Sequence, residues 1–161
     1  MSYLWFLEVK TKYNHGYILW SNKGGGEDGS GNVVLAENGT IIFRKNKKLL
    51  LEYLSALKIT ETSIRDGGFY DYSVSPARMI GLLKGRRAKY ILDLLNLVSD
   101  IALSIDSHEI DFIQSPCSVV GKVMDEVTIY NKVRNIQLLS SEELQNEIFN
   151  ILEWVEKKMI A

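Results

Sequence analysis

Apolar residues recur at helical spacing along the stretch from Ala88 to Ile105, which contains neither Gly nor Pro. Further leucines lie elsewhere around the cylinder, so we expect a central helix that is buried on more than one side. A narrow polar strip remains on this helix. The apolar face consists of Ile91, Leu94, Leu95, Val98, Ile101, Ala102 and Ile105, and the polar strip of Asp93, Asn96 and Asp100.

The first 44 residues have the pattern of strands rather than helices. Aromatic and β-branched residues fill Tyr3–Val9 and Gly16–Ser21, and a short polar segment between them suits a hairpin. Two more short runs, 32–36 and 40–44, flank a turn that contains Asn38-Gly39, a pair that favours the positive φ angles of a tight hairpin. The pattern predicts an antiparallel meander of about four strands.

Helical signals dominate the rest of the chain. Besides the central helix, we expect helices over 46–57, from Ser75-Pro76 onward, over 117–133 and from Ser140 to Met159. Ser140 and Glu143 fit a capping box for the last of these helices. Residues 58–75 look irregular, and 109–113 could form a short strand. The predicted fold is α+β, with the meander packed against four to five helices in a single domain over 1–161.

Composition points to a cytoplasmic protein. The chain has 161 residues, of which 46% are hydrophobic and 24% are charged, as in ordinary globular domains. Its apolar runs are shorter than the ~18 residues that cross a bilayer. Met1–Val9 lacks the features of a signal peptide, and the single Cys117 cannot form an internal disulfide. We therefore expect a reduced, cytoplasmic protein with no membrane partner.

Charge is distributed unevenly along the chain. Residues 44–92 carry eleven Lys and Arg against four Asp and Glu, whereas residues 93–161 carry five against twelve. Two solvated faces would explain this, and so would a partner that is complementary to one of them. Basic runs at 44–48 and 84–89 leave a regulatory nucleic-acid-binding module as an alternative, although the pI near 6.1 disfavours direct nucleic-acid binding.

Motifs for cofactors and metals are weak. Gly24–Gly29 matches G-x-G-x-x-G, but a strand rather than a helix is expected after it, and Glu27 and Asp28 would repel phosphates. Asp106, His108, Glu109 and Asp111 form a polar cluster whose spacing matches no established metal site. We expect no cofactor and no metal.

Asp93 and Asp100 on the central helix are the best candidates for acid–base chemistry. Carboxylates on one helix face occur in active sites, and also where a helix faces water or holds a neighbouring segment. We expect Asp93, Asn96 and Asp100 to be structural and the protein not to be an enzyme. A small hydrolase that uses the two carboxylates stays as the alternative.

The segment Asn96–Ile105, NLVSDIALSI, resembles the N-L-x-x-D-[IL]-A-x-S-[IV] segment of immunity proteins from bacterial contact-dependent growth inhibition and related polymorphic toxin systems. Phe69–Tyr72 before a short helix and Ile129–Lys132 before a final acidic helix resemble that family as well. The chain departs from its pattern at Leu95 and Arg134, where aromatic residues are expected, and at Asn131, where Asp is expected. The resemblance covers about residues 69–160.

The resemblance implies a cytoplasmic immunity protein that binds and neutralises the C-terminal toxin domain of a cognate effector, without catalysis or a small-molecule substrate. If the toxin is a basic nuclease, acidic patches would cover its cleft, with exposed aromatic residues as anchors. The expected contact residues are Glu27, Asp28, Tyr70, Tyr72, Asp106, Glu109, Asp111, Glu142, Glu143 and Glu147.

Overall fold

The computed structural model describes residues 4–22, 33–58 and 63–160. Its main sheet has the strand order β3-β2-β1-β6. The strands are β1 (Leu4–Lys10), β2 (His15–Ser21), β3 (Val33–Val34) and β6 (Ile64–Asp71), while β4 (Ala36–Glu37) and β5 (Thr40–Ile41) form a separate small hairpin. The helices are α1 (Lys47–Ala56), α2 (Pro76–Leu83), α3 (Ala88–Ser104), α4 (Val119–Tyr130) and α5 (Glu142–Lys158), with short 3₁₀ helices η1 (Asp111–Gln114) and η2 (Ile136–Ser140).

The α+β class is confirmed, but the sheet is mixed rather than a clean meander. β1 pairs with β2 in antiparallel fashion, as predicted, and with β6 in parallel fashion, so that Leu4 lies opposite Ile64. The prediction of an irregular segment over 58–75 was therefore wrong. β6 lies at the edge of the sheet, so it needs no continuous apolar face. For this reason its polar and glycine-rich sequence lacks the usual strand pattern.

Two glycines let β6 approach β1 closely. A Cβ on Gly67 would lie 2.4 Å from the Leu7 side chain, and Gly68 has a φ angle of 115°, which L-residues rarely adopt. The pairing register shifts at this point, between Phe6 and Glu8 of β1. The Gly-Gly pair thus forms a bulge that re-aims the aromatic residues after it.

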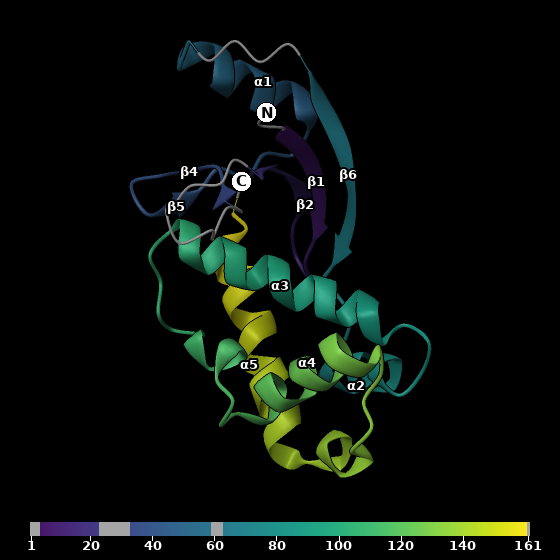
Figure 1. The fold of residues 1–161 in the computed structure, drawn as a ribbon. Helices are drawn as coiled ribbons and strands as arrows, with labels where there is room; N and C mark the ends of the chain where they lie inside the picture. The colour runs from purple at the N-terminus through teal and green to yellow at the C-terminus, as the bar shows by residue number, and fades with distance from the viewer. Residues whose placement is uncertain (1–3, 23–32, 59–62, 161) are drawn as a thin grey trace.

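Side chains alternate between two cores on either side of the sheet. On one side α1 covers a small cluster of Phe6, Leu19, Ile42, Leu50 and Leu54. On the other side Val9 and Ile18 join a larger core with α3 and α5, while α2 and α4 complete the lower part of the molecule (Figure 1). α3 is buried along most of its length, as the central helix was predicted to be.

One local prediction is confirmed here and two are corrected. Asn46 caps α1, since its side chain accepts from the backbone N–H of Leu49 at 3.0 Å. Ser141, one residue later than expected, caps α5, because η2 continues through Ser140. Residues 109–113 are not a strand: Ile110 and Ile113 are both buried, three residues apart, on one side of a 3₁₀ turn. None of the described helices is long and apolar enough to span a membrane.

Candidate binding surface

The polar strip of α3 contains one residue that links it to the sheet. The indole Nε1 of Trp20 donates to Asp100 Oδ2 at 3.1 Å, and burial raises the pKa of the Asp100 carboxyl above its ordinary value. One turn further, the Ser104 hydroxyl donates to the Asp100 carbonyl and accepts from Val34 N–H, both at 2.7 Å. Asp93 and Asn96 are exposed and make no side-chain hydrogen bond with the described residues. Asp100 therefore has contacts that a structural role requires, whereas the other two do not.

An acidic surface follows directly after α3. Asp106, His108, Glu109 and Asp111 are all exposed there, and we call them the acidic loop surface. His108 Nδ1 lies 2.9 Å from Asp111 Oδ2, and its Nε2 lies 3.5 Å from Asp106 Oδ1. The pKa of His108 is raised, first by the hydrogen bond to Asp111 and then by the charges of Asp111 and Asp106. Near neutral pH this surface therefore gathers negative charge around one titratable imidazole.

The end of α3 sets the position of this loop. Asp106 has a φ angle of 53°, its N–H donates to Leu103 O at 3.2 Å, and Ser107 N–H donates to Ala102 O at 2.9 Å. This is a Schellman motif, in which glycine usually occupies the left-handed position. Here an aspartate occupies it, so a charged side chain is kept where glycine would fit with less strain.

A hollow of about 320 Å³ lies between the acidic loop surface and α3. Ser99 and Leu103 line it from α3, and Gln114 closes it from η1 by donating to the Ser99 hydroxyl at 2.9 Å. Leu103 is 57% exposed, although we expected the leucines outside the main stripe to be buried. An exposed apolar side chain with a charged rim is the usual anatomy of a protein-binding surface. Its sequence signal is a leucine off the apolar stripe, followed closely by three acidic residues.

The second predicted acidic cluster lies elsewhere. Glu142 and Glu143 are exposed in the first turn of α5, at the lower end of the molecule, away from the end of α3 (Figure 1). Glu147 is already engaged, because its carboxylate accepts from Val120 N–H at 2.8 Å at the start of α4. The structure therefore does not join the two clusters.

The predicted aromatic anchors differ in exposure. Tyr72 is 3% exposed, and its hydroxyl donates to Leu94 O at 2.7 Å, so it cannot contact a partner in this structure. Its burial also raises the pKa of the phenol well above the ordinary value. Tyr70, two residues earlier, is partly buried, and its pKa is raised by burial and then by the charge of Asp93. Glu27 and Asp28 lie outside the described residues.

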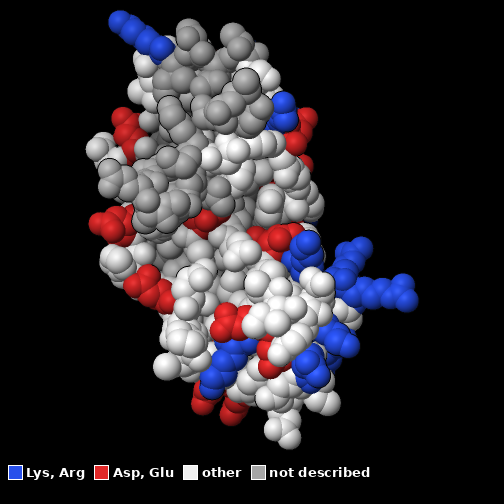
Figure 2. Space-filling model, in the orientation of Figure 1, with Lys and Arg blue, Asp and Glu red and all other residues white. Residues whose placement is uncertain are grey.

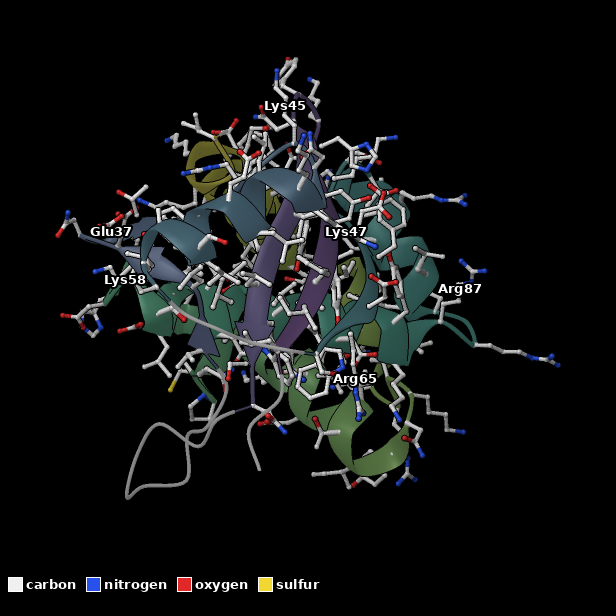
Figure 3. The ribbon with its side chains drawn as sticks, turned by 90° about the horizontal axis from the view of Figure 1, so that it is seen from above. Glu37, Lys45, Lys47, Lys58, Arg65 and Arg87 are labelled. Carbon is white, nitrogen blue, oxygen red and sulfur yellow. The ribbon has the colours of Figure 1, made fainter. Side chains whose placement is uncertain are left out.

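The two basic runs do not form one surface. Seen from above, Lys45 and Lys47 lie around the start of α1, whereas Arg87 lies apart, at the side where α2 and α3 meet (Figure 3). Lys47 is also paired with Asp66 of β6 at 2.6 Å. Figure 2 shows a group of Lys and Arg at the α2–α3 side, whereas Asp and Glu are spread over the visible face, some of them beside that group. A nucleic-acid interface that uses both runs at once is not supported by this arrangement.

In the part of the chain that the structure describes, no three His, Cys, Asp or Glu side chains are grouped so as to hold a metal ion. His108 has two carboxylates beside it, but the three residues are exposed and lie on one loop without the closed geometry of a metal centre.

Comparison with known proteins relates the chain to a solved structure but not to a sequence family. No family model matches the sequence, and none of the curated proteins matches it. The chain is similar to a crystal structure of the SatS C-terminal domain in complex with bromine, with a TM-score of 0.67 and 16% sequence identity. The match covers 96% of this chain and 91% of that chain. The two share a fold. At this level of identity the likeness concerns the fold alone.

Proposed function

We propose that this protein is a cytoplasmic immunity protein, which binds and neutralises the C-terminal toxin domain of a cognate contact-dependent growth inhibition effector. One observation carries the proposal. The segment Asn96–Ile105, which resembles the immunity family, presents its partly buried Ser99 and its exposed Leu103 to the hollow beside the acidic loop surface. The segment that carries the resemblance and this candidate binding surface therefore lie together at the end of α3.

The charges of this surface suit a basic partner. Asp106, Glu109 and Asp111 are exposed around the hollow, and Glu109 has one distant cation, Lys158, at 3.9 Å. Negative potential of this kind steers a positively charged domain, such as a nuclease, and favours its correct orientation. Leu103 supplies an apolar contact at the centre, where binding energy concentrates in protein interfaces. Glu142 and Glu143 would form a second, separate contact.

The direct test uses the C-terminal domain of a secreted effector encoded next to this protein. The two chains should co-purify, and co-expression should protect cells from that toxin domain. Affinity is then measured by calorimetry at two salt concentrations. Replacing Asp106 and Asp111 together by Asn removes two charges and keeps a residue that tolerates the left-handed conformation. We expect affinity to fall about tenfold or more, which corresponds to ~1.4 kcal/mol, and its salt dependence to weaken.

Matched variants separate the parts of this proposal. Glu52→Gln on α1 removes one exposed carboxylate on a different element and should leave affinity unchanged. Leu103→Ala tests the apolar contact without a change of charge. Absence of both co-purification and protection for the wild-type chain would refute the immunity function. Tight binding that none of the Asp106, Asp111 and Leu103 variants alters would instead refute this surface.

A further inference from the structure

A second hollow, of about 370 Å³, lies where the end of β6, α2 and the start of α3 meet. Val74 and Leu82 form apolar parts of its lining and pack against the large core. The rings of Phe69 and Tyr90 also line it, and the Tyr90 hydroxyl accepts from the backbone N–H of Asp71 at 3.3 Å. Its volume is in the range of small-molecule sites, and core packing fixes its walls.

Two arginines from different elements line the same hollow. Arg78 comes from α2 and Arg87 from the start of α3. The backbone of each is hydrogen-bonded, but neither guanidinium group has an ion-pair or hydrogen-bond partner among the described residues. Asp71 is the carboxylate in the lining. Its Oδ1 accepts from the N–H of Ser73 at 2.9 Å and from the Ser73 hydroxyl, so it is held by its own turn rather than by an arginine.

The surroundings add to this positive charge. Lys84 and Arg86 are exposed on the turn between α2 and α3, and Lys89 is exposed in the first turn of α3. Figure 2 shows Lys and Arg gathered at this side. Arg87 lies well apart from the α1 lysines in Figure 3. The cationic surface is therefore local to the hollow, and it lies at the opposite end of α3 from the acidic loop surface.

We propose that this hollow is a binding site for a nucleotide-class ligand, a flat ring system that carries a phosphate. Guanidinium groups bind phosphate through paired N–H donors, which suits Arg78 and Arg87. The faces of Phe69 and Tyr90 offer stacking to a base, whatever its identity. Asp71 Oδ2 takes part in neither Ser73 bond and can accept from a sugar hydroxyl. The glycine-rich Gly24–Gly29 motif has no part in this site.

Calorimetric titration of the full chain with adenosine monophosphate, adenosine and inorganic phosphate tests the assignment. The monophosphate should bind saturably, and adenosine and phosphate should each bind about tenfold more weakly or worse, because each offers only part of the contacts. Arg78→Gln and Arg87→Gln should each weaken monophosphate binding by roughly 10- to 100-fold, as loss of a charge-assisted hydrogen bond does. Phe69→Leu should weaken binding of the monophosphate while leaving that of phosphate unchanged.

Arg86→Gln is the matched control, since Arg86 is adjacent to Arg87, carries the same charge and does not line the hollow. If it weakens binding as much as Arg87→Gln does, diffuse positive charge rather than this site attracts the ligand. If phosphate binds as tightly as the monophosphate, the nucleotide assignment is wrong. If none of the three probes binds saturably, the hollow is not a binding site for this class of ligand. Unchanged circular dichroism of each variant shows that folding is intact. The test needs no toxin, so its outcome is independent of the immunity proposal.

Discussion

The Trp20 indole donates to the Asp100 carboxylate across 80 residues of sequence, at 3.1 Å. Trp20 also packs edge-on against Trp5, with ring centroids 5.1 Å apart and an interplanar angle of 60°. Through these contacts β1, β2 and α3 meet at one point. Asp100 is therefore part of the packing between the sheet and its central helix.

Removing this carboxylate should destabilise the fold. Asp100→Ala leaves the partly buried Trp20 N–H without its acceptor, and we expect the free energy of unfolding to fall by about 1–3 kcal/mol. Urea denaturation followed by tryptophan fluorescence measures the change. Asp93 lies on the same helix but is exposed, so Asp93→Ala should change the free energy of unfolding by no more than about 0.5 kcal/mol. Equal effects of the two substitutions would contradict a special structural role for Asp100.

Asp100 should also make stability depend on pH. Its pKa in the folded protein is raised by burial, an effect that the Trp20 hydrogen bond opposes, so the folded state binds the proton more tightly than the unfolded chain. The corresponding stabilisation is complete below the ordinary pKa of 3.8 and is lost as pH rises through the raised value. Asp100→Asn lacks this titration. The free energy of unfolding of Asp100→Asn, relative to that of the wild type, should therefore increase between pH 3 and pH 7. A difference that stays constant across this pH range would contradict a raised pKa of Asp100.

Two helical glycines should respond in opposite directions to alanine. A Cβ on Gly121 would lie 1.9 Å from the Ser115 carbonyl oxygen, so Gly121→Ala should lower the free energy of unfolding by about 1–3 kcal/mol. An added Cβ on Gly81 in α2 would meet no atom within 4 Å apart from its chain neighbours and the backbone of its own helix. Gly81→Ala should therefore raise the free energy of unfolding by about 0.5–1 kcal/mol. Thermal unfolding of both variants checks the pair. A stabilising Gly121→Ala would mean that the start of α4 packs differently.

His108 should titrate above its ordinary pKa of 6.5, with Asp111 as the main cause. Asp111→Asn should lower the pKa of the imidazole more than Asp106→Asn does, because Asp111 contributes the hydrogen bond and the larger charge effect. Glu109→Gln should change it least. NMR titration of the imidazole C–H signals gives these values directly. As pH rises through the pKa of His108, the loop loses a positive charge, and any attraction for a basic partner should increase.

Glu147 should contribute to stability rather than to partner binding. Its carboxylate holds Val120 N–H at the start of α4, so Glu147→Ala should lower the free energy of unfolding by about 1–3 kcal/mol. Glu153 is exposed on the same helix, and Glu153→Ala should remain within about 0.5 kcal/mol of the wild type. If Glu147→Ala weakens toxin binding without lowering the free energy of unfolding, Glu147 belongs to the binding surface instead.

The parts of the fold that could be predicted are those fixed by neighbouring residues. α3 was expected over 88–105 and is found over Ala88–Ser104, because apolar spacing and the lack of breakers act within one helix. The Asn46 and Ser75 caps followed from equally local rules. β6 was missed because its evidence lies in the parallel partner β1, some 60 residues earlier, and not in its own polar sequence.

The same distinction holds for the sites. Asp106 and Asp111 lie close together in the sequence, so their clustering could be predicted. The exposure of Leu103 depends instead on how η1 folds back on α3. Tyr72 was predicted to be exposed because an aromatic residue gives no indication of which face it will take. Arg78 and Phe69 line one hollow only because the end of β6, α2 and the start of α3 come together in the fold, which no local sequence pattern records.

The bulge at Gly67-Gly68 has a consequence for association between copies of the chain. Among the described strands, the main sheet ends in β3, which is two residues long, and in β6. A long, regular edge would invite a second molecule to add its own strand. The register shift interrupts β6 in the middle, and the charged Arg65 and Asp66 lie exposed before it. Both ends of the sheet are thus poor templates for open-ended strand addition, which protects the protein against aggregation at high concentration.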